Sequence, residues 1–468
     1  MLNVGCWMFS LPRHPMRRPL LSLCLATLLA CPVLAVDKPR VFILTDISSL
    51  AAGEREPDDG QSLIRLLLYS HTLDIEGLAA SSNLGHGQVV RPGLIRQAIQ
   101  AYDQVRPNLL LHRADFPSAE RLDRLVKSGQ PVAGPAVRVN DSIGRGKDTE
   151  ASDALITAVD REDPRPLWVC AWGGTADLAQ ALWKVRAERS GGDLAAFLAK
   201  LRIHAIADQD STGPWLRENF PTLHYTLREV AYRGMYRGGD PAPVSAEWVE
   251  KNVRTGHGRL GGLYPSYRGG DIWSSMLGPV QGVKEGDTPS FLGLIPNGLN
   301  VPGRIGLSSW GGRLEGPALR PVDARSEVGE DRDPDPRIAA VYRWRRAFQA
   351  DFQARLDWCV KPATSANHAP EAGIRGETRR TVKPGESLQL DASTSSDPDL
   401  DRLRYEWLID LPAAELAGCQ IEGADTAKAR LVVPAGVVAR ELPLLLIVRD
   451  EGEPALEGYA RIEVTIER

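Results

Sequence analysis

The sequence predicts an α/β domain, with a mostly parallel sheet and helices on both of its faces, followed by an all-β immunoglobulin-like sandwich. Three observations support this prediction. The chain has 468 residues, which exceeds what one hydrophobic core usually organises and favours two domains. Up to residue 360, short apolar runs alternate with amphipathic stretches, a pattern typical of βαβ units. Beyond residue 370, apolar residues recur at every second position, as in strands with one buried face.

The first 35 residues have the features of a secretory signal peptide. Three arginines precede an apolar run at 20–30, and a small-residue cleavage site ends at Ala35. We therefore predict a secreted or periplasmic protein that is cleaved near Ala35. The apolar run is too short to cross a membrane well, so no transmembrane anchor is expected. A lipoprotein attached through Cys31 is the less favoured alternative.

The composition is that of an ordinary soluble globular protein, with 43% hydrophobic and 25% charged residues. The formal net charge is −4, and because the leader holds three arginines and no acids, the mature chain carries −7. No basic stripe offers contacts to phosphates, so we expect no nucleic acid polymer as a partner. Cys170, Cys359 and Cys419 remain after the leader, and their spacing matches no metal-binding motif.

Strands and helices alternate along the predicted α/β domain, which spans residues 36–360. Strands are expected at 41–45, 75–81, 167–172 and 203–207, and helices at 61–70, 176–186, 215–220 and 337–358. Because helices connect these strands, we expect the strands to run parallel. Binding sites in such sheets form at the carboxyl ends of the strands.

The segment 361–369 is polar and flanked by prolines, and we predict that it is a linker. Residues 370–468 then show the short alternating strands of an immunoglobulin-like sandwich, with Trp407 as the expected core aromatic. The segment 397–401 carries aspartate at every second position. It has two interpretations, a solvated turn or a structural calcium site, and the turn is favoured.

Acidic residues gather where the first predicted strand ends and the next helix begins. Asp46 follows the strand, and Glu56, Asp58 and Asp59 stand just before the helix. One acid is enough to cap a helix and complement its dipole, so capping explains Asp58 or Asp59 but not the whole group. Crowded carboxylates repel one another unless a cation neutralises them, and calcium prefers oxygen ligands. The cluster therefore predicts a calcium site.

This arrangement is similar to the signature D-x-D-x-G-x-D-D of the calcium-dependent inosine-uridine nucleoside hydrolases. The resemblance implies that Asp46 is the metal-linked catalytic acid that activates water, that Asp59 is a metal ligand, and that Asp58 binds a sugar hydroxyl. The sequence departs from the signature in two respects. Eleven residues, in place of three, separate Asp46 from Asp58, and Leu44 replaces the first aspartate. We expect the inserted loop to reshape the pocket.

Further segments resemble later motifs of these hydrolases. Asn83, after the second predicted strand, is similar to the asparagine that faces the catalytic acid. The segment 173–179 resembles the turn G-P-L-T-N-L-A, which gives a backbone carbonyl to calcium, here that of Ala176. Asp208 and Asp210 resemble the acceptors of the A-E-F-N segment, which hold the primary hydroxyl of the sugar. The resemblance therefore implies one catalytic, one metal-binding and two substrate-binding residues in these segments.

Asp287 occupies the place of the late H-D-P motif, and the resemblance implies that it is the last metal ligand. In the family, a histidine beside this aspartate often helps to protonate the departing base. Here Gly286 precedes Asp287. His86, in the loop after the second predicted strand, is the nearby alternative acid, although an ordinary surface histidine is the favoured interpretation.

The whole chain after the leader resembles a group of secreted bacterial proteins in which a nucleoside-hydrolase-like domain precedes a PKD-like or immunoglobulin-like sandwich, some of them described as cellulose-binding. The phrases that carry this resemblance are 56–59, 172–174, 284–292, 296–299 and 310–313. It implies calcium-dependent hydrolysis of an N- or O-glycosidic bond in a small ribosyl or other sugar-containing substrate. The alternative is a non-catalytic carbohydrate-binding protein, for example for cellulose, that retains the hydrolase fold. The substrate and the oligomeric state are not predicted.

Overall fold

The computed structural model describes residues 38–467 except 52–56, 82–88, 270–279 and 330–334. Its main domain is built on an eight-stranded sheet in the order β3-β2-β1-β4-β5-β6-β8-β7. Neighbouring strands are parallel apart from the pair β7 and β8, which confirms the predicted mostly parallel sheet. The strands are β1 (Arg40–Thr45), β2 (Asp74–Ala80), β3 (Val126–Ser128), β4 (Leu167–Ala171), β5 (Leu201–Ile206), β6 (His224–Arg228), β7 (Leu314–Glu315) and β8 (Val322–Asp323).

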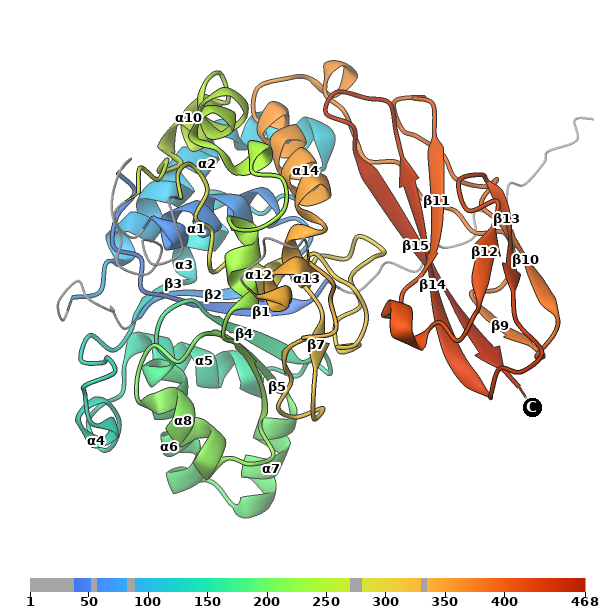
Figure 1. Cartoon of the computed structure of the whole chain (residues 1–468). Helices are drawn as coiled ribbons and strands as arrows, with labels where there is room; N and C mark the ends of the chain where they lie inside the picture. The colour runs from blue at the N-terminus through green and yellow to red at the C-terminus, as the bar shows by residue number, and fades with distance from the viewer. Residues whose placement is uncertain (1–37, 52–56, 82–88, 270–279, 330–334, 468) are drawn as a thin grey trace, which may run out of the picture. The chain divides into compact units, whose positions relative to one another are not determined.

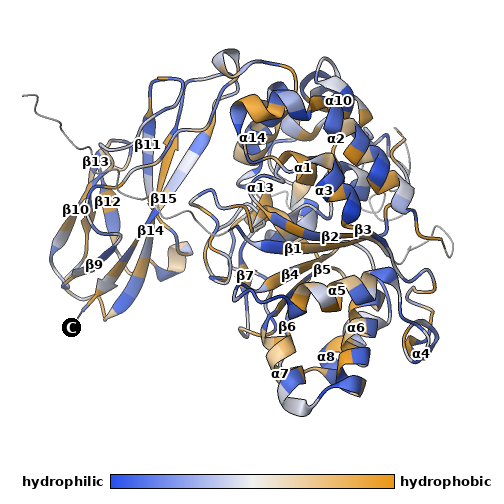
Figure 2. Ribbon diagram, turned by 180° about the vertical axis from the view of Figure 1, so that it is seen from behind, coloured by the Kyte–Doolittle hydropathy of each residue, from blue (hydrophilic) through white to orange (hydrophobic). Residues whose placement is uncertain are grey.

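Helices cover both faces of this sheet (Figure 1). Alternation along β1 explains the two layers: Val41 and Ile43 pack with one group of helices, and Phe42 and Leu44 with the other. The first group includes α1 (Asp58–Leu68), α2 (Pro92–His112), α10 (Gly258–Leu263) and α14 (Arg345–Trp358), and the second includes α5 (Glu150–Asp160), α6 (Ala176–Glu188), α7 (Gly191–Ala199) and α8 (Thr212–Asn219). Figure 2 shows the strands as a largely hydrophobic layer between them.

Shorter helices lie in the connections. They are α3 (Ala119–Arg124), α4 (Val139–Ser142), α9 (Ala246–Val249), α12 (Pro289–Leu292), α13 (Ala339–Tyr342), and the single turns η1 (Ala231–Met235), η2 (Ala242–Val244), η3 (Glu250–Arg254), η4 (Pro336–Ile338), η5 (Ala363–Ser365) and η6 (Ala413–Glu415). The closing helix predicted at 337–358 is divided into η4, α13 and α14. In the described part of the chain, no helix is long and apolar enough to cross a membrane.

Helix α1 begins at Asp58, three residues before the predicted start. Asp58 and Asp59 stand in its first turn, where negative charge complements the helix dipole. Pro57 directly precedes them, and its carbonyl accepts a hydrogen bond from the amide of Gln61. Both acids therefore project from the end of α1 that lies next to the end of β1.

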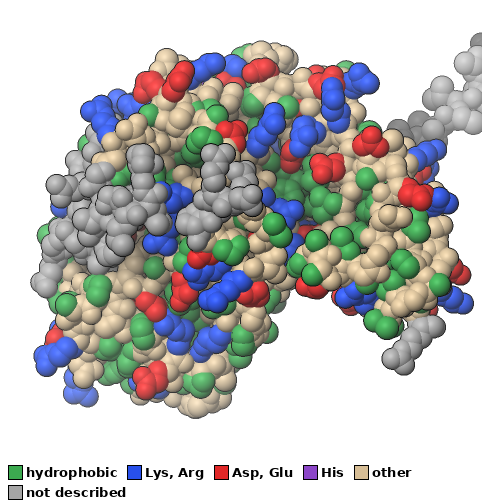
Figure 3. Space-filling model, in the orientation of Figure 1, with side chains coloured by type: hydrophobic (Ala, Val, Ile, Leu, Met, Phe, Trp, Pro, Cys, Tyr) green, Lys and Arg blue, Asp and Glu red, His purple; other side chains and the backbone are tan. Residues whose placement is uncertain are grey.

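The C-terminal residues form two sheets, β10-β13-β12 and β11-β14-β15-β9, as predicted for a sandwich. The strands are β9 (Arg379–Val382), β10 (Ser387–Asp391), β11 (Arg404–Ile409), β12 (Gln420–Glu422), β13 (Lys428–Val432), β14 (Arg440–Arg449) and β15 (Glu457–Ile466). Trp407 is buried in the core between them, as expected. Acidic and basic side chains are interspersed on the face of the described chain in Figure 3.

Residues 38–468 form one compact unit, in which buried polar contacts join the sandwich to the main domain. Asp410, which follows β11, is 2% exposed. Its carboxylate accepts hydrogen bonds from the amide (3.0 Å) and hydroxyl (2.6 Å) of Ser308. Arg313 and Arg461 also donate to it, at 2.9 and 2.7 Å. Arg313, the last residue of the phrase 310–313, therefore contributes to the contact between the two domains.

Candidate functional site

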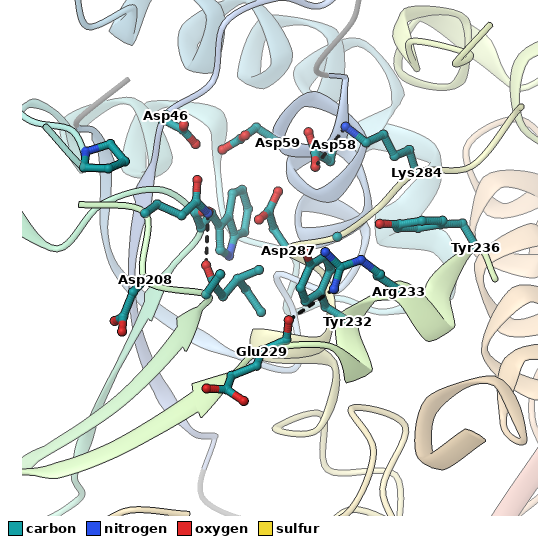
Figure 4. Close-up of a pocket in the computed structure, with 16 residues that line it drawn as sticks. Asp46, Asp58, Asp59, Asp208, Glu229, Tyr232, Arg233, Tyr236, Lys284 and Asp287 are labelled. Carbon is teal, nitrogen blue, oxygen red and sulfur yellow. Dashed lines mark hydrogen bonds and ion pairs between the residues drawn. The ribbon is translucent and has the colours of Figure 1, made fainter. Parts of the chain in front are cut away.

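A cavity of about 250 Å³ opens at the carboxyl ends of β1 and β5, where sites in parallel sheets are expected. Figure 4 shows the side chains that line it. The polar and charged ones are Asp46, Asp58, Asp59, Asp208, Gln209, Glu229, Tyr232, Arg233, Tyr236, Lys284 and Asp287. Pockets for drug-sized ligands enclose about 300–1,000 Å³, so the cavity suits a small molecule better than a polymer chain.

Three carboxylates converge at one end of the cavity. Oxygen atoms of Asp58, Asp59 and Asp287 lie within 4.8 Å of one another. Asp59 is 6% exposed and accepts a hydrogen bond from the hydroxyl of Thr45, the last residue of β1. Asp287 is 3% exposed, and its Oδ2 atom is buried without a hydrogen-bond partner in the described chain. The structure thus brings together side chains that the sequence separates by more than two hundred residues.

The pKa values of Asp59 and Asp287 are raised. Burial raises the pKa of Asp59 well above its ordinary value, and the charges of Asp46 and Asp58 raise it further. Burial also raises the pKa of Asp287, followed by the charges of Asp59, Asp58 and Asp46. A bound cation removes both causes at once, because it neutralises the cluster and takes the place of the lost hydration.

Asp46 lies at the edge of the same cluster, directly after β1. It is half-buried, and its carboxylate in Figure 4 stands beside that of Asp59. Its side chain packs against Gly173, which follows β4. The neighbouring strands β1 and β4 therefore determine its position together.

More than half of the chain matches a known family. Residues 40–314 match the family described as cellulose-binding Sde182, nucleoside hydrolase-like domain. The chain belongs to this family. Residues 387–466 match the C-terminal domain of the cellulose-binding protein Sde0182. Both halves of the predicted resemblance are therefore confirmed.

Solved structures include a relative of the same architecture. A nucleoside hydrolase-related hypothetical protein from Saccharophagus degradans, described as associated with carbohydrate metabolism, is 30% identical, with a TM-score of 0.76. The alignment covers 92% of this chain and 100% of that one. The PKD domain of the KIAA 1837 protein is 24% identical over 22% of this chain and 91% of its own, but its TM-score of 0.17 supports no conclusion. No curated protein matches the chain.

Asp208 and Asp210, which the sequence analysis predicted to bind the sugar, are not part of the carboxylate cluster of this Sde182-type domain. Asp208 lines the cavity, but its carboxylate forms an ion pair with Arg217 at 2.7 Å and points away from Asp46 and Asp59 in Figure 4. Asp210 does not line the cavity. It is 5% exposed, and its Oδ1 atom accepts hydrogen bonds from the amide and hydroxyl of Thr212 in the first turn of α8. Its Oδ2 atom is buried without a hydrogen-bond partner in the described chain, and its contact with a sugar stays a prediction.

Ala176 and Asn83 are the two further residues predicted for the Sde182-type site. Ala176 is the fully buried first residue of α6 and is not among the residues that line the cavity. The contribution of its carbonyl to a cation stays a prediction. Asn83 lies outside the described residues, as does His86.

The sequence did not indicate one wall of the cavity. Tyr232, Arg233 and Tyr236 come from η1 and the residue that follows it, a single turn without helical periodicity. Asp323 of β8 positions this turn: one oxygen accepts hydrogen bonds from the amides of residues 229, 230 and 231 at 2.8–2.9 Å. No local pattern links Asp323 to residues about ninety positions earlier, so spacing alone does not reveal this wall.

Lys284 is another residue of the site that the sequence analysis did not single out. Its side chain is 4% exposed, and its Nζ atom lies 3.8 Å from Oδ2 of Asp58. It stands three residues before Asp287 in the segment 284–292. The resemblance of this segment to the family was the feature of the sequence that could have indicated Lys284. Lys284 places a positive charge beside the acids at the rim of the cluster.

Proposed function

We propose that the cavity binds a small sugar-containing compound together with calcium and hydrolyses an N- or O-glycosidic bond in it. The observation that carries this proposal is the convergence of Asp46, Asp58, Asp59 and Asp287 at one end of a cavity in a nucleoside hydrolase-like fold. Burying several acids together is costly unless cations neutralise them. Among the described lining residues, the cations are Arg233 and Lys284, fewer than the four acids.

The acids suit a hard cation. Calcium takes six to eight oxygen ligands, and carboxylates are its usual protein donors. Asp59 and Asp287 would hold the ion, with Asp46 beside them and the Ala176 carbonyl as a further expected ligand. The unpartnered buried Oδ2 of Asp287 supports this assignment. When bound, the ion would orient sugar hydroxyls and lower the pKa of water.

The protein groups then have distinct tasks. Asp46 is half-buried and accessible from the cavity, so it accepts the proton of the attacking water. Asp58 accepts a hydrogen bond from a sugar hydroxyl, and Nζ of Lys284 lies 3.8 Å from its carboxylate. Tyr232 and Tyr236 form an amphipathic wall on which the leaving group packs.

Sugar binding without turnover is the second candidate function. Two observations favour it: the family is described as cellulose-binding, and no histidine is found among the described residues that line the cavity. A site without a general acid forgoes a factor of about 10²–10⁴ in rate. The cavity would then serve as a cation-assisted receptor for a small sugar or a chain end.

One set of measurements on the mature protein separates these functions. Calorimetry with calcium, and with calcium plus ribose or short oligosaccharides, tests binding, and activated nitrophenyl glycosides test turnover. Calcium-dependent turnover that Asp46→Asn abolishes while sugar binding persists supports the hydrolase. Sugar binding without turnover of any activated glycoside supports the receptor. A protein that binds no calcium contradicts both versions of the proposal.

A further inference from the structure

Helix α1 carries the two acids Asp58 and Asp59 at its start and a set of contacts to the loop that bears Asp287. The acids repel Asp287, so something else must hold the loop against the helix. Gln61, Ser62 and Arg65 do this. Asp58, Gln61 or Ser62, and Arg65 follow one another at intervals of three to four residues, and so lie along one face of the helix.

The strongest of these contacts is the ion pair between Arg65 and Glu285. Nε of Arg65 lies 2.5 Å from one oxygen of Glu285, and Nη2 lies 2.9 Å from the other. Both side chains are fully buried. The Tyr264 hydroxyl donates to Oε1 of Glu285, the oxygen that Nη2 contacts, at 2.6 Å, and the Thr288 hydroxyl donates to Oε2 at 2.8 Å. Glu285 is thus held by four donors, two residues before Asp287.

Further bonds fasten the rest of the loop to α1. The Gln61 carboxamide oxygen accepts the amide of Lys284 at 2.7 Å, and its nitrogen donates to the carbonyl of Gly282 at 2.8 Å. The hydroxyls of Ser62 and Thr288 lie 2.9 Å apart. Arg65 in turn stacks on Phe352 of α14, with 3.8 Å between its guanidinium carbon and the ring centroid. The loop therefore has a defined position relative to Asp59 before any ligand binds.

We infer that the buried Arg65–Glu285 ion pair is the positioning element of the cation site, which sets Asp287 against Asp59. This inference rests on the proposed function. Arg65 stands about 10 Å along the helix from the acids, so it acts through Glu285 and does not touch the ligand. A bidentate guanidinium pair fixes both distance and orientation, which an ammonium ion does not do.

The chain offers a matched control. Arg40 and Glu76 form a second buried bidentate pair, with 2.5 and 2.9 Å between their atoms and side chains that are 0% and 3% exposed. This pair lies at the start of β1, whereas the cluster lies beyond the end of that strand. Arg40→Lys therefore imposes a similar loss of packing and hydrogen bonding far from the site.

The test is calcium calorimetry on the chelator-treated mature protein and its Arg65→Lys and Arg40→Lys variants, with thermal unfolding as the measure of stability. Groups that orient metal ligands typically contribute a factor of about 10–100 in affinity, so Arg65→Lys should weaken calcium binding by that factor. Arg40→Lys should lower the melting temperature comparably and leave the calcium affinity within about twofold. Tyr264→Phe keeps the ion pair but removes one donor to Glu285, and should weaken binding about fivefold in a folded protein.

The outcomes are distinct. A wild-type protein that binds no calcium overturns both the proposed function and this inference. A wild-type protein that binds calcium, with equal affinities in Arg65→Lys and Arg40→Lys or an unchanged affinity in Tyr264→Phe, overturns the inference alone.

Discussion

Gly173 leaves space for the carboxylate of Asp46. A Cβ atom at position 173 would lie 2.6 Å from the carboxyl carbon of Asp46 and 2.7 Å from its Oδ1 atom, well inside van der Waals contact. Gly173 follows β4 and Asp46 follows β1, and these two strands are neighbours in the sheet. The absence of a side chain at 173 is therefore a condition for the observed position of the proposed general base.

We expect Gly173→Ala to displace Asp46 and to reduce hydrolysis of an activated glycoside by about a hundredfold, because misplacement of a reacting group by about 1 Å has effects of this size. Gly191→Ala is the control, since a Cβ at position 191 meets no atom within 4 Å. Steady-state kinetics and a crystal structure of each variant check this. Full activity of Gly173→Ala with Asp46 in place contradicts the steric argument.

Calcium affinity should fall as the pH falls. Burial and neighbouring acids raise the pKa of Asp59 and Asp287 well above the ordinary value, so protons compete with calcium at pH values where an exposed aspartate is already ionised. Each proton that calcium displaces changes the affinity by about tenfold per pH unit. Calorimetry across a pH series in buffers of different ionisation enthalpy measures both quantities. A calcium affinity independent of pH between about 5 and 7 contradicts the assignment of these residues as ligands.

The same shifts predict how Asp287→Asn changes stability in the absence of metal. A carboxyl whose pKa is raised by folding stabilises the protein below the unfolded pKa, and this contribution is lost as the pH rises through the folded pKa. In chelator, Asp287→Asn should therefore melt at a higher temperature than wild type, by a margin that grows with pH. Added calcium should raise the melting temperature of wild type only. A variant that is less stable than wild type at every pH would contradict the prediction that ionised Asp287 destabilises the metal-free protein.

Inosine should be a poor substrate even when calcium is bound. Gly286 stands before Asp287, and no histidine is among the described lining residues that might protonate the base. An activated nitrophenyl riboside needs no acid and should be cleaved faster, by a factor of about 10² or more. Comparison of kcat/KM for the two compounds checks this. Inosine cleavage at about 10⁴ per molar per second or above would be inconsistent with it.

We expect the sandwich to fold as an isolated fragment, and we expect Asp410 to attach it to the main domain in the whole chain. Its own core includes Trp407, so a fragment of residues 370–468 should give β-type circular dichroism and cooperative unfolding. In the whole chain, Asp410→Ala removes the carboxylate partner of Arg461 and one of the two carboxylate partners of Arg313, which keeps Glu327, and should cost about 3–5 kcal/mol. The exposed Asp425→Ala should change stability by less than about 0.5 kcal/mol. Urea unfolding of both variants tests this, and equal stabilities would contradict the docking role.

Local sequence patterns were enough to predict the parallel sheet, the sandwich and the main acidic cluster. Strand and helix periods depend on neighbouring residues, so the alternation of apolar runs indicates βαβ units without knowledge of the contacts. The order of the chain through a parallel sheet then brings strand ends to one edge, which is why Asp46 and Asp59 could be assigned to one site. Asp287 was added through its resemblance to the late H-D-P motif. Similarity to a motif does not show whether a side chain faces the cavity: Asp208 lines it, and Asp210 is not among the lining residues.

Tertiary structure alone decided the remaining parts of the site. Arg65 and Glu285 are separated by 220 positions, and Asp323 by more than ninety from the turn that it holds. Nothing in the composition or period of either segment marks such a pair, because a buried polar contact depends on which chain segments the fold packs together. The sequence by itself therefore determined which acids meet at the edge of the sheet. Packing between distant segments decided how closely they meet, which residues wall the cavity, and what holds the repelling carboxylates in place.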